Sequence, residues 1–145
     1  MKKLLLLIMI VFVAVTAANA RDNYYRDASV LPMFAQTQLK KVFKARVNLV
    51  KVDKSLGRVD EYEVVLADGT EIEFDRAGNW KSVEVGKGSE VPSAIVPESI
   101  RKYVKKTQNQ KIVGIEKNRR HYKVELANDV EMIFNLNGNF VRYDD

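Results

Sequence analysis

The stretch YEVVLADGTEIEFDRAGNW, residues 62–80, decides the fold, because YKVELANDVEMIFNLNGNF, residues 122–140, repeats its pattern sixty positions later. We call these stretches the first and the second cassette. Aligned from their initial tyrosines, they share eight of 19 residues. Apolar and polar residues alternate in both, which predicts β-strands with one apolar face.

The turns within each cassette set the pairing of these strands. A three-residue loop that ends at Gly69 places Tyr62 opposite Phe74, so that the apolar residues of both strands share a face. A two-residue turn would instead put them on opposite faces. The same rule in the second cassette places Tyr122 opposite Phe134. Each cassette is therefore predicted to be a three-stranded antiparallel meander.

Two helical patterns precede the cassettes. Apolar residues recur at steps of three and four in residues 31–43 and 96–107, and an aliphatic strand follows each pattern, at about 46–53 and 111–117. The outer faces of both helices are basic, which is typical of a solvated helix face, with an anionic-surface site as the alternative.

This order of elements predicts an α+β fold of two tandem helix-plus-antiparallel-sheet units, with both helices packed on one face of the sheet. The half-repeats are expected at about 29–85 and 92–145, joined by a linker at 86–90. Residues 21–28 have no periodicity and are expected to be a loose N-terminal segment, in which two tyrosines could alternatively cover a sheet edge or contact a partner.

The N-terminus has the features of a secretory signal peptide. Residues 1–20 combine two lysines, an apolar run and an Ala-Asn-Ala cleavage signal. The apolar run is too short to span a bilayer, and no cysteine is available for a lipid anchor. We expect residues 21–145 to form one periplasmic or secreted domain without a membrane anchor after cleavage. Lys2 and Lys3 contribute two of the five net positive charges, so nucleic acid is not an expected partner.

The sequence offers little for catalysis or metal binding. His121 is the single histidine and there is no cysteine. Glu71, Glu73 and Asp75 alternate along one strand, as a carboxylate-based hydrolase or a calcium site would require. The same alternation is typical of any half-exposed strand, and the spacing of a calcium-binding loop is absent. We therefore predict no catalytic residue, no cofactor and no metal site.

The sheet face that the helices leave open is the predicted binding surface. Aliphatic and aromatic groups among charges on an open face are typical of a protein-binding patch. The alternatives are that β-branched residues occur there only as strand formers, or that the patch is a homodimer face. The residues expected on it are Val65, Glu73, Lys81, Val83, Lys123, Ile133, Val141 and Tyr143.

The paired Y-x-V-x-L-x-(D/N) and G-N-(W/F) motifs, each after an aliphatic-Pro helix, resemble the PepSY-like family of periplasmic proteins. That family is related in fold to the β-lactamase-inhibitory protein. The resemblance implies a non-enzymatic envelope protein that binds another protein. It also implies that the partner is an envelope hydrolase or peptidase, which the protein would inhibit or regulate. It supplies no catalytic residues, and the residues after the helices differ from the family pattern.

Two other functions stay open at this point. A cavity between the helices and the sheet would instead suit a small-ligand or peptide sensor of the cell envelope. An enzyme that uses Glu71 and Glu73 is the weakest alternative, because nothing in their surroundings indicates a reaction.

Overall fold

The computed structural model describes residues 23–144. The expected signal peptide, residues 1–20, lies outside the described residues. The elements in chain order are β1 (Tyr24–Tyr25), a 3₁₀ turn η3 (Ala28–Val30), α1 (Met33–Val42), β2 (Val47–Ser55), β3 (Arg58–Leu66), β4 (Glu71–Asp75), β5 (Trp80–Glu84), α2 (Glu98–Thr107), β6 (Ile112–Lys117), β7 (His121–Leu126), β8 (Glu131–Asn135) and β9 (Phe140–Asp144).

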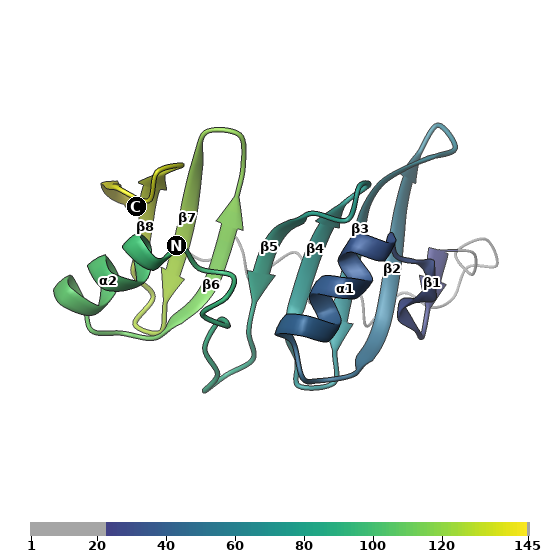
Figure 1. Cartoon of the computed structure of the whole chain (residues 1–145), viewed down its shortest axis with the longest axis horizontal. Coiled ribbons are helices and arrows are strands. Elements are labelled where there is room, and N and C mark those ends of the chain that lie inside the picture. The colour runs from purple at the N-terminus through teal and green to yellow at the C-terminus, as the bar shows by residue number, and fades with distance from the viewer. Residues whose placement is uncertain (1–22, 145) are drawn as a thin grey trace.

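The nine strands of residues 23–144 form one antiparallel sheet, and their order in the sheet is their order in the chain (Figure 1). The predicted division into two tandem helix-plus-sheet units is therefore wrong. The correction rests on the pairing of β5 with β6, in which Ser82 lies opposite Glu116 and Val83 opposite Ile115. Each cassette would otherwise end in an unpaired strand edge, and pairing the two edges satisfies their backbone N–H and C=O groups. The two helices are short, and the sheet dominates the molecule.

The predicted register within both cassettes is confirmed. Tyr62 pairs with Phe74, and Tyr122 pairs with Phe134. The three-residue loop of the first cassette ends at Gly69 with φ 84°, and the equivalent loop of the second ends at Asp129 with φ 64°. Both residues have the left-handed conformation that this type of hairpin loop requires.

A β-bulge in the last strand of each cassette changes which residues face the core. The pairing shifts by one residue between Phe74↔Trp80 and Glu73↔Ser82, and in the same way at Phe134↔Phe140. The extra residue reverses the alternation after it. Val83 therefore lies opposite Ile72 on the helix side of the sheet, although simple alternation from Trp80 predicts the other face.

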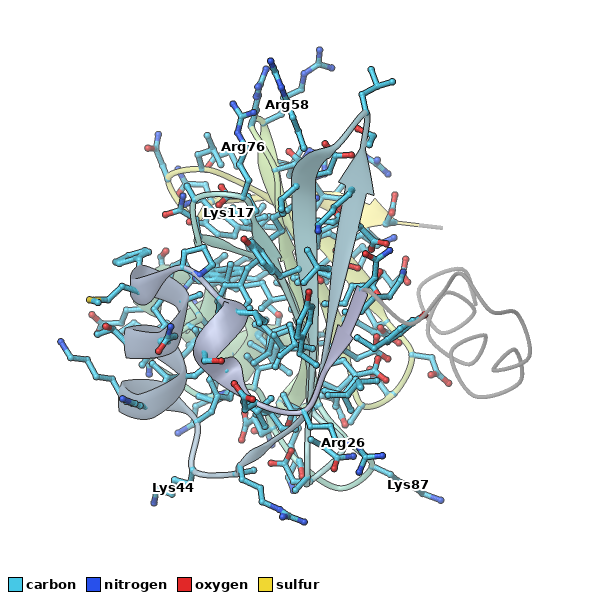
Figure 2. All side chains as sticks on the ribbon, turned by 90° about the vertical axis from the view of Figure 1, so that its right-hand side faces the viewer. Arg26, Lys44, Arg58, Arg76, Lys87 and Lys117 are labelled. Atoms are coloured by element: carbon cyan, nitrogen blue, oxygen red, sulfur yellow. The ribbon has the colours of Figure 1, made fainter. Side chains whose placement is uncertain are left out.

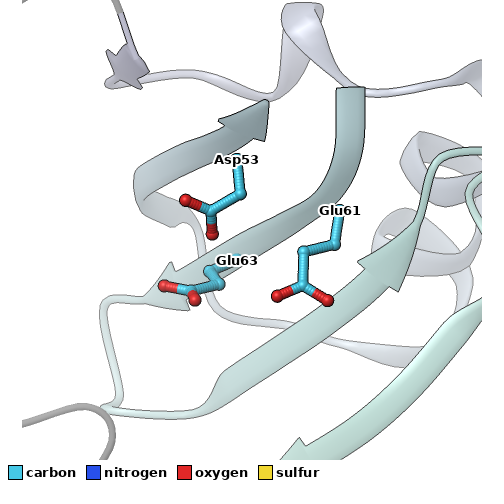
Figure 3. A group of neighbouring side chains, drawn as sticks. All are labelled: Asp53, Glu61 and Glu63. Atoms are coloured by element: carbon cyan, nitrogen blue, oxygen red, sulfur yellow. The ribbon is translucent and has the colours of Figure 1, made fainter. Parts of the chain in front are cut away.

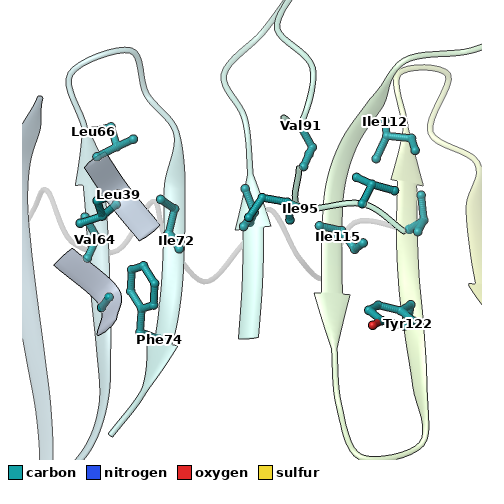
Figure 4. Close-up of a cluster of buried hydrophobic side chains, with 14 of the residues drawn as sticks. Leu39, Val64, Leu66, Ile72, Phe74, Val91, Ile95, Ile112, Ile115 and Tyr122 are labelled. Carbon is teal, nitrogen blue, oxygen red and sulfur yellow. The ribbon is translucent and has the colours of Figure 1, made fainter. Parts of the chain in front are cut away.

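Both helices lie over one face of the sheet and close a single hydrophobic core. α1 buries Ala35 and Leu39, and α2 buries Ile100 and Val104. Figure 4 shows core side chains above strands of both cassettes. Residues 91–95, which precede α2, supply Val91 and Ile95 between these two groups, so the core continues across the β5–β6 junction.

The segment after the expected signal peptide is ordered from residue 23 onward. Tyr24 and Tyr25 form β1 and pair with Lys51 and Val50 of β2, and Tyr25 packs against the core. The expectation of a loose segment over 21–28 is therefore wrong for its described part, and the alternative that the tyrosines cover a sheet edge describes it better. The apolar body of Tyr25 gives this short strand its anchor.

Candidate functional site

The candidate site is the sheet face opposite the helices, which we call the open face. Cross-strand partners share a face, so the register defines its rows. One row, which we call the acidic row, runs across the middle of the sheet through Glu71, Glu84, Gly114, Glu125 and Glu131. Within residues 23–144, no helix covers this face.

The open face carries most, but not all, of the residues predicted for it. Four of them share rows of this face: Val65, Glu73, Lys123 and Ile133. Lys81 is the extra residue of the first bulge and reaches this face through its ion pair with Glu61. Ile133 is only 5% exposed there, so it contributes little accessible apolar surface.

The bulges change the positions of the three other predicted residues. Val83 is 1% exposed in the core, so its placement on the open face is wrong. Tyr143 lies opposite Met132 on the helix side, where its hydroxyl accepts a hydrogen bond from Gln108 at 3.0 Å, so its placement is wrong too. Val141 is the extra residue of the second bulge and is 55% exposed. The open face is therefore more charged and less apolar than the sequence suggests.

In the second cassette, a lysine neutralises the carboxylates of the open face. Lys123 Nζ lies 2.7 Å from Glu131 Oε2 and 2.9 Å from Asp144 Oδ2. Arg142 adds a contact of 2.8 Å between its Nη1 and Asp144 Oδ1. Lys123 is only about one-fifth exposed, so these pairs are weakly screened by solvent.

On the part of the open face formed by β2 to β5, lysines pair with the carboxylates on one side only. Lys51 Nζ lies 3.0 Å from Asp53 and 3.4 Å from Glu63, and Lys81 Nζ lies 2.7 Å from Glu61 Oε2. The carboxylates of Asp53, Glu61 and Glu63 gather within 4.8 Å of one another (Figure 3). Three carboxylates at this spacing could hold a divalent cation. Lys51 already supplies a positive charge to two of them, so a metal ion would compete with its ammonium group.

Three of the four carboxylates in the acidic row have no such counter-ion. Among the described residues, Glu71, Glu84 and Glu125 make no ion pair. Burial, followed by the charges of Glu84, Glu63 and Glu73, raises the pKa of Glu71 to about 7. Burial and neighbouring carboxylates also raise the pKa values of Glu84 and Glu125. Like charges directly opposite each other destabilise a sheet, so this row is an unfavourable arrangement in the protein alone.

Three other features bear on catalysis and ligand binding: the single histidine, the strand carboxylates and a groove beside α2. His121 begins β7, and one of its ring nitrogens lies 3.0 Å from the side-chain amide of the nearby Asn118. Glu71 and Glu73 lie on the open face, where the hydroxyl of Ser82, opposite Glu73, donates a hydrogen bond to the Glu73 carboxylate. A groove of about 600 Å³ beside α2 has Val96, Val104 and Ile112 among its lining, with cations at Arg101 and Lys105.

Basic groups lie elsewhere on the molecule. Figure 2 shows Arg58, Arg76 and Lys117 at one end of the strands, and Arg26, Lys44 and Lys87 at the other. α1 and α2 carry further lysines in their last turns. The net positive charge of the chain therefore coexists with an open face on which acidic side chains outnumber basic ones.

Comparison with known families identifies the family of this chain. Residues 60–142, which include both cassettes, match the model of the family described as "Putative beta-lactamase-inhibitor-like, PepSY-like". The chain belongs to the PepSY-like family. The resemblance inferred from the cassette motifs is thereby confirmed. A comparison with curated proteins finds no match.

Three solved structures of periplasmic proteins resemble the chain over most of its length. A "putative calcium-regulated periplasmic protein" from Bacteroides thetaiotaomicron is 34% identical, with a TM-score of 0.75, covering 82% of this chain and 94% of that one. A "putative periplasmic protein of unknown function" from Bacteroides vulgatus is 37% identical, with a TM-score of 0.77, covering 84% and 98%. A third periplasmic relative, also from Bacteroides vulgatus, is 32% identical, with a TM-score of 0.74, covering 86% and 99%.

These relatives confirm the expected periplasmic or secreted location. None of the described helices is long and apolar enough to cross a membrane.

Sequence reasoning missed the groups that distinguish the open face. Glu84, Gly114 and the cluster of Asp53, Glu61 and Glu63 were not among the predicted site residues. Gly114 and Glu84 become neighbours only through the β5–β6 pairing, which nothing in the local pattern indicates. A signal for the bulges was present, because the apolar residues Trp80 and Val83 are three positions apart, where an unbroken strand would space them by two.

Proposed function

We propose that this PepSY-like protein is a non-enzymatic binding module of the periplasm that binds another protein through its open face. We further propose that the partner is an envelope hydrolase or peptidase, whose activity the module inhibits or regulates. The observation that supports this is the asymmetry of the sheet. The helices cover one face, and the other presents a broad array of charged groups.

Three features support binding over catalysis. The open face offers an area spread over several strands and not a cleft that would enclose a substrate. Among the described residues, the single histidine, His121, lies opposite Asn135 and outside the rows of acidic groups, so it is not placed to activate Ser82 beside Glu73. The family to which the chain belongs is described as β-lactamase-inhibitor-like, which is a likeness to an inhibitor and not to an enzyme.

Site-specific photocrosslinking tests this proposal. A photoreactive amino acid replaces Val65 on the open face, and a control variant carries it at Met33, which is 81% exposed on α1. In the native envelope, we expect a discrete covalent adduct from position 65 and none from position 33. Purified partner is then assayed for hydrolysis with and without the module. Equal labelling from both positions, or none from position 65, would contradict the proposal.

The groove beside α2 favours a second candidate, a small-ligand or peptide sensor. Its apolar floor and its cations at Arg101 and Lys105 suit a ligand that combines an apolar group with an anionic one. Acidic envelope metabolites should then raise the melting temperature of the protein, and less so for Arg101→Gln. An unchanged melting temperature across such ligands would eliminate this candidate.

A further inference from the structure

We propose that the open face recognises a basic surface of its partner protein, and that a lysine or arginine side chain of the partner lies over Gly114, between Glu71, Glu84 and Glu125. This inference rests on the proposed function and adds to it the chemistry of the partner.

The second cassette shows how such a site is filled. Glu131 and Asp144 occupy the positions that correspond, sixty residues later, to Glu71 and Glu84 of the first cassette. Their carboxylates hold the ammonium group of Lys123 at 2.7 and 2.9 Å. A pair of acidic residues on adjacent strands in this register therefore accommodates a lysine head group.

The first cassette has the same acidic pair but lacks the lysine. The residue that corresponds to Lys123 is Glu63, which adds a negative charge in place of a positive one. Glu71 and Glu84 face each other directly across β4 and β5. Their mutual repulsion, and the raised pKa that accompanies it at Glu71, would be relieved by a cation from outside the chain.

Gly114 puts no side chain between the neighbouring carboxylates of this row, and the side chain of Glu125 extends over it. Gly114 lies opposite Glu84 on one side and Glu125 on the other. A methyl group added at Gly114 would meet the Cβ and the Oε2 atoms of Glu125 at 3.4 Å. Oε2 of Glu125 is buried and has no hydrogen-bond partner among the described residues. A nearby positive charge would offset the cost of that unpaired oxygen.

The chemistry favours a side chain of a protein over a bare metal ion. The oxygens of Glu71, Glu84 and Glu125 do not form a group within 4.8 Å, whereas those of Asp53, Glu61 and Glu63 do. A metal ion needs converging ligands, whereas an ammonium or guanidinium group on a long stem satisfies carboxylates that are spread along a row. Val65, which continues the row beside Glu71, offers apolar contact for the rest of a polypeptide.

The test uses a defined probe, an acetylated and amidated hexapeptide of alternating threonine and lysine. Its binding to mature protein is followed by NMR titration of the backbone amides, Gly114 among them. One triple variant carries Glu71→Gln, Glu84→Gln and Glu125→Gln. A matched variant loses the same charge elsewhere through Asp60→Asn, Glu90→Gln and Glu98→Gln, which are all exposed.

We expect the peptide to bind the wild-type protein and to shift the Gly114 resonance. The Kd should rise by about ten-fold or more in the acidic-row variant and by less than about three-fold in the matched variant. A hexapeptide of threonine and acetyl-lysine should not bind. No binding of the lysine peptide, or an equal loss of affinity in both variants, would overturn the inference. Self-association of the protein that requires Glu71, Glu84 and Glu125 would also overturn it, because the occupant would then be a second copy of the chain.

A further experiment distinguishes a failure of this inference from a failure of the proposed function. The photoreactive residue at position 65 is combined with each triple variant. If the adduct persists in the acidic-row variant, the open face still binds a protein and only the present inference is wrong. If no adduct forms even in the otherwise wild-type chain, the proposed function itself fails. Loss of the adduct in the acidic-row variant alone supports both.

Discussion

The two cassettes have the same backbone arrangement but differ in whether the carboxylates of the open face have counter-ions. Both have the same strand register, the same three-residue loops and the same bulge. In the second cassette, Lys123 and Arg142 neutralise the acidic groups of the open face. In the first, Glu63 replaces the central lysine, and Glu71 and Glu84 are left without a counter-ion.

This difference separates what forms the fold from what is available for binding. Seven of the eight identical positions lie in the core or the turns, which fix the register. Several positions that differ, among them Glu63 with Lys123 and Val65 with Glu125, lie on the open face, where substitution leaves the register intact. A sheet built in this way can vary one face without changing the other, and the predictions below test that separation from the largest expected effect to the smallest.

The largest effect tests the bulge. Val83→Asp places a carboxylate in the core, so we expect the free energy of unfolding to fall by about 4 kcal/mol or more. Val141→Asp, at the exposed bulge residue of the second cassette, should cost less than about 1 kcal/mol. Urea denaturation of both variants measures this. Similar losses for the two would show that Val83 does not face the core.

The next effect concerns the ion pairs of the second cassette. Lys123→Met leaves the partly buried Glu131 and Asp144 without their lysine, and we expect a loss of about 2–3 kcal/mol in unfolding free energy. Lys102→Met removes an exposed helix pair with Glu98 and should cost less than about 0.5 kcal/mol. A loss at Lys123 no larger than that at Lys102 would mean that the two cassettes do not differ in electrostatic stability.

In the first cassette, where Glu71 has no counter-ion, the carboxylate should lower the stability of the protein, and this effect should depend on pH. The pKa of Glu71 is about 7 in the folded protein, above its usual value of 4.5. Between these values the folded state binds more protons than the unfolded state, so stability falls as the pH rises from about 4.5 to about 7 and is flat above that. After allowance for solvent screening, we expect this one group to lower the free energy of unfolding by about 1 kcal/mol across that pH range.

The pH effect is checked by unfolding wild-type and Glu71→Gln proteins at a series of pH values. The variant should be more stable than wild type at pH 8, with a smaller difference at pH 4. Glu90→Gln, at an exposed position, should retain the wild-type profile. A Glu71→Gln profile parallel to that of wild type would refute the assignment.

Converting the first cassette toward the second sharpens the comparison. Glu63→Lys places an ammonium group where Lys123 stands in the second cassette. We expect the pKa of Glu71 to fall toward its usual value, because an opposite charge replaces a like one. Carbon-13 NMR titration of the side-chain carboxyls measures it, with Glu63→Gln as the neutral control. A larger fall with glutamine than with lysine would show that the new ammonium group does not reach Glu71.

The smallest effect concerns the hairpin loops. Asp129 has a left-handed backbone with φ 64°, where its counterpart is Gly69. Asp129→Gly should stabilise the protein by about 0.5 kcal/mol, and Gly69→Asp should destabilise it by about 1 kcal/mol. Thermal unfolding of both variants compares them. A stabilising Gly69→Asp would show that the two loops differ in ways that their backbone angles do not reveal.

The sequence was sufficient for the parts of the fold that depend on neighbours in the chain. The hairpin register followed from the position of Gly69 and the alternation around Tyr62 and Phe74. The bulge was missed because alternation was carried past Trp80, although the spacing to Val83 contradicts it. The joined sheet was missed because Gly86 and the residues after it were interpreted as a boundary between units. They form a turn beside the junction, where Val85 N–H donates to the carbonyl of Val113.

The candidate site was predictable only as a face. Alternation correctly placed Glu73, Lys81 and Lys123 on the side away from the helices. Whether a given carboxylate has a counter-ion depends on residues from other strands, such as Gly114 beside Glu84. Those neighbours are set by long-range pairing, and no local pattern shows them.

The order of the strands has a consequence for how the protein forms. Within residues 23–144, strands pair only with their neighbours in the chain, so this sheet contains no crossover connection. Pairing between strands that are adjacent in the chain keeps contacting residues closer in sequence than crossovers would, and a lower contact order favours faster folding. A chain that reaches its compartment unfolded and N-terminus first could complete its first cassette before its second arrives. The edge of β5 would then stay unpaired until β6 forms, and the remaining strands would be added from that edge.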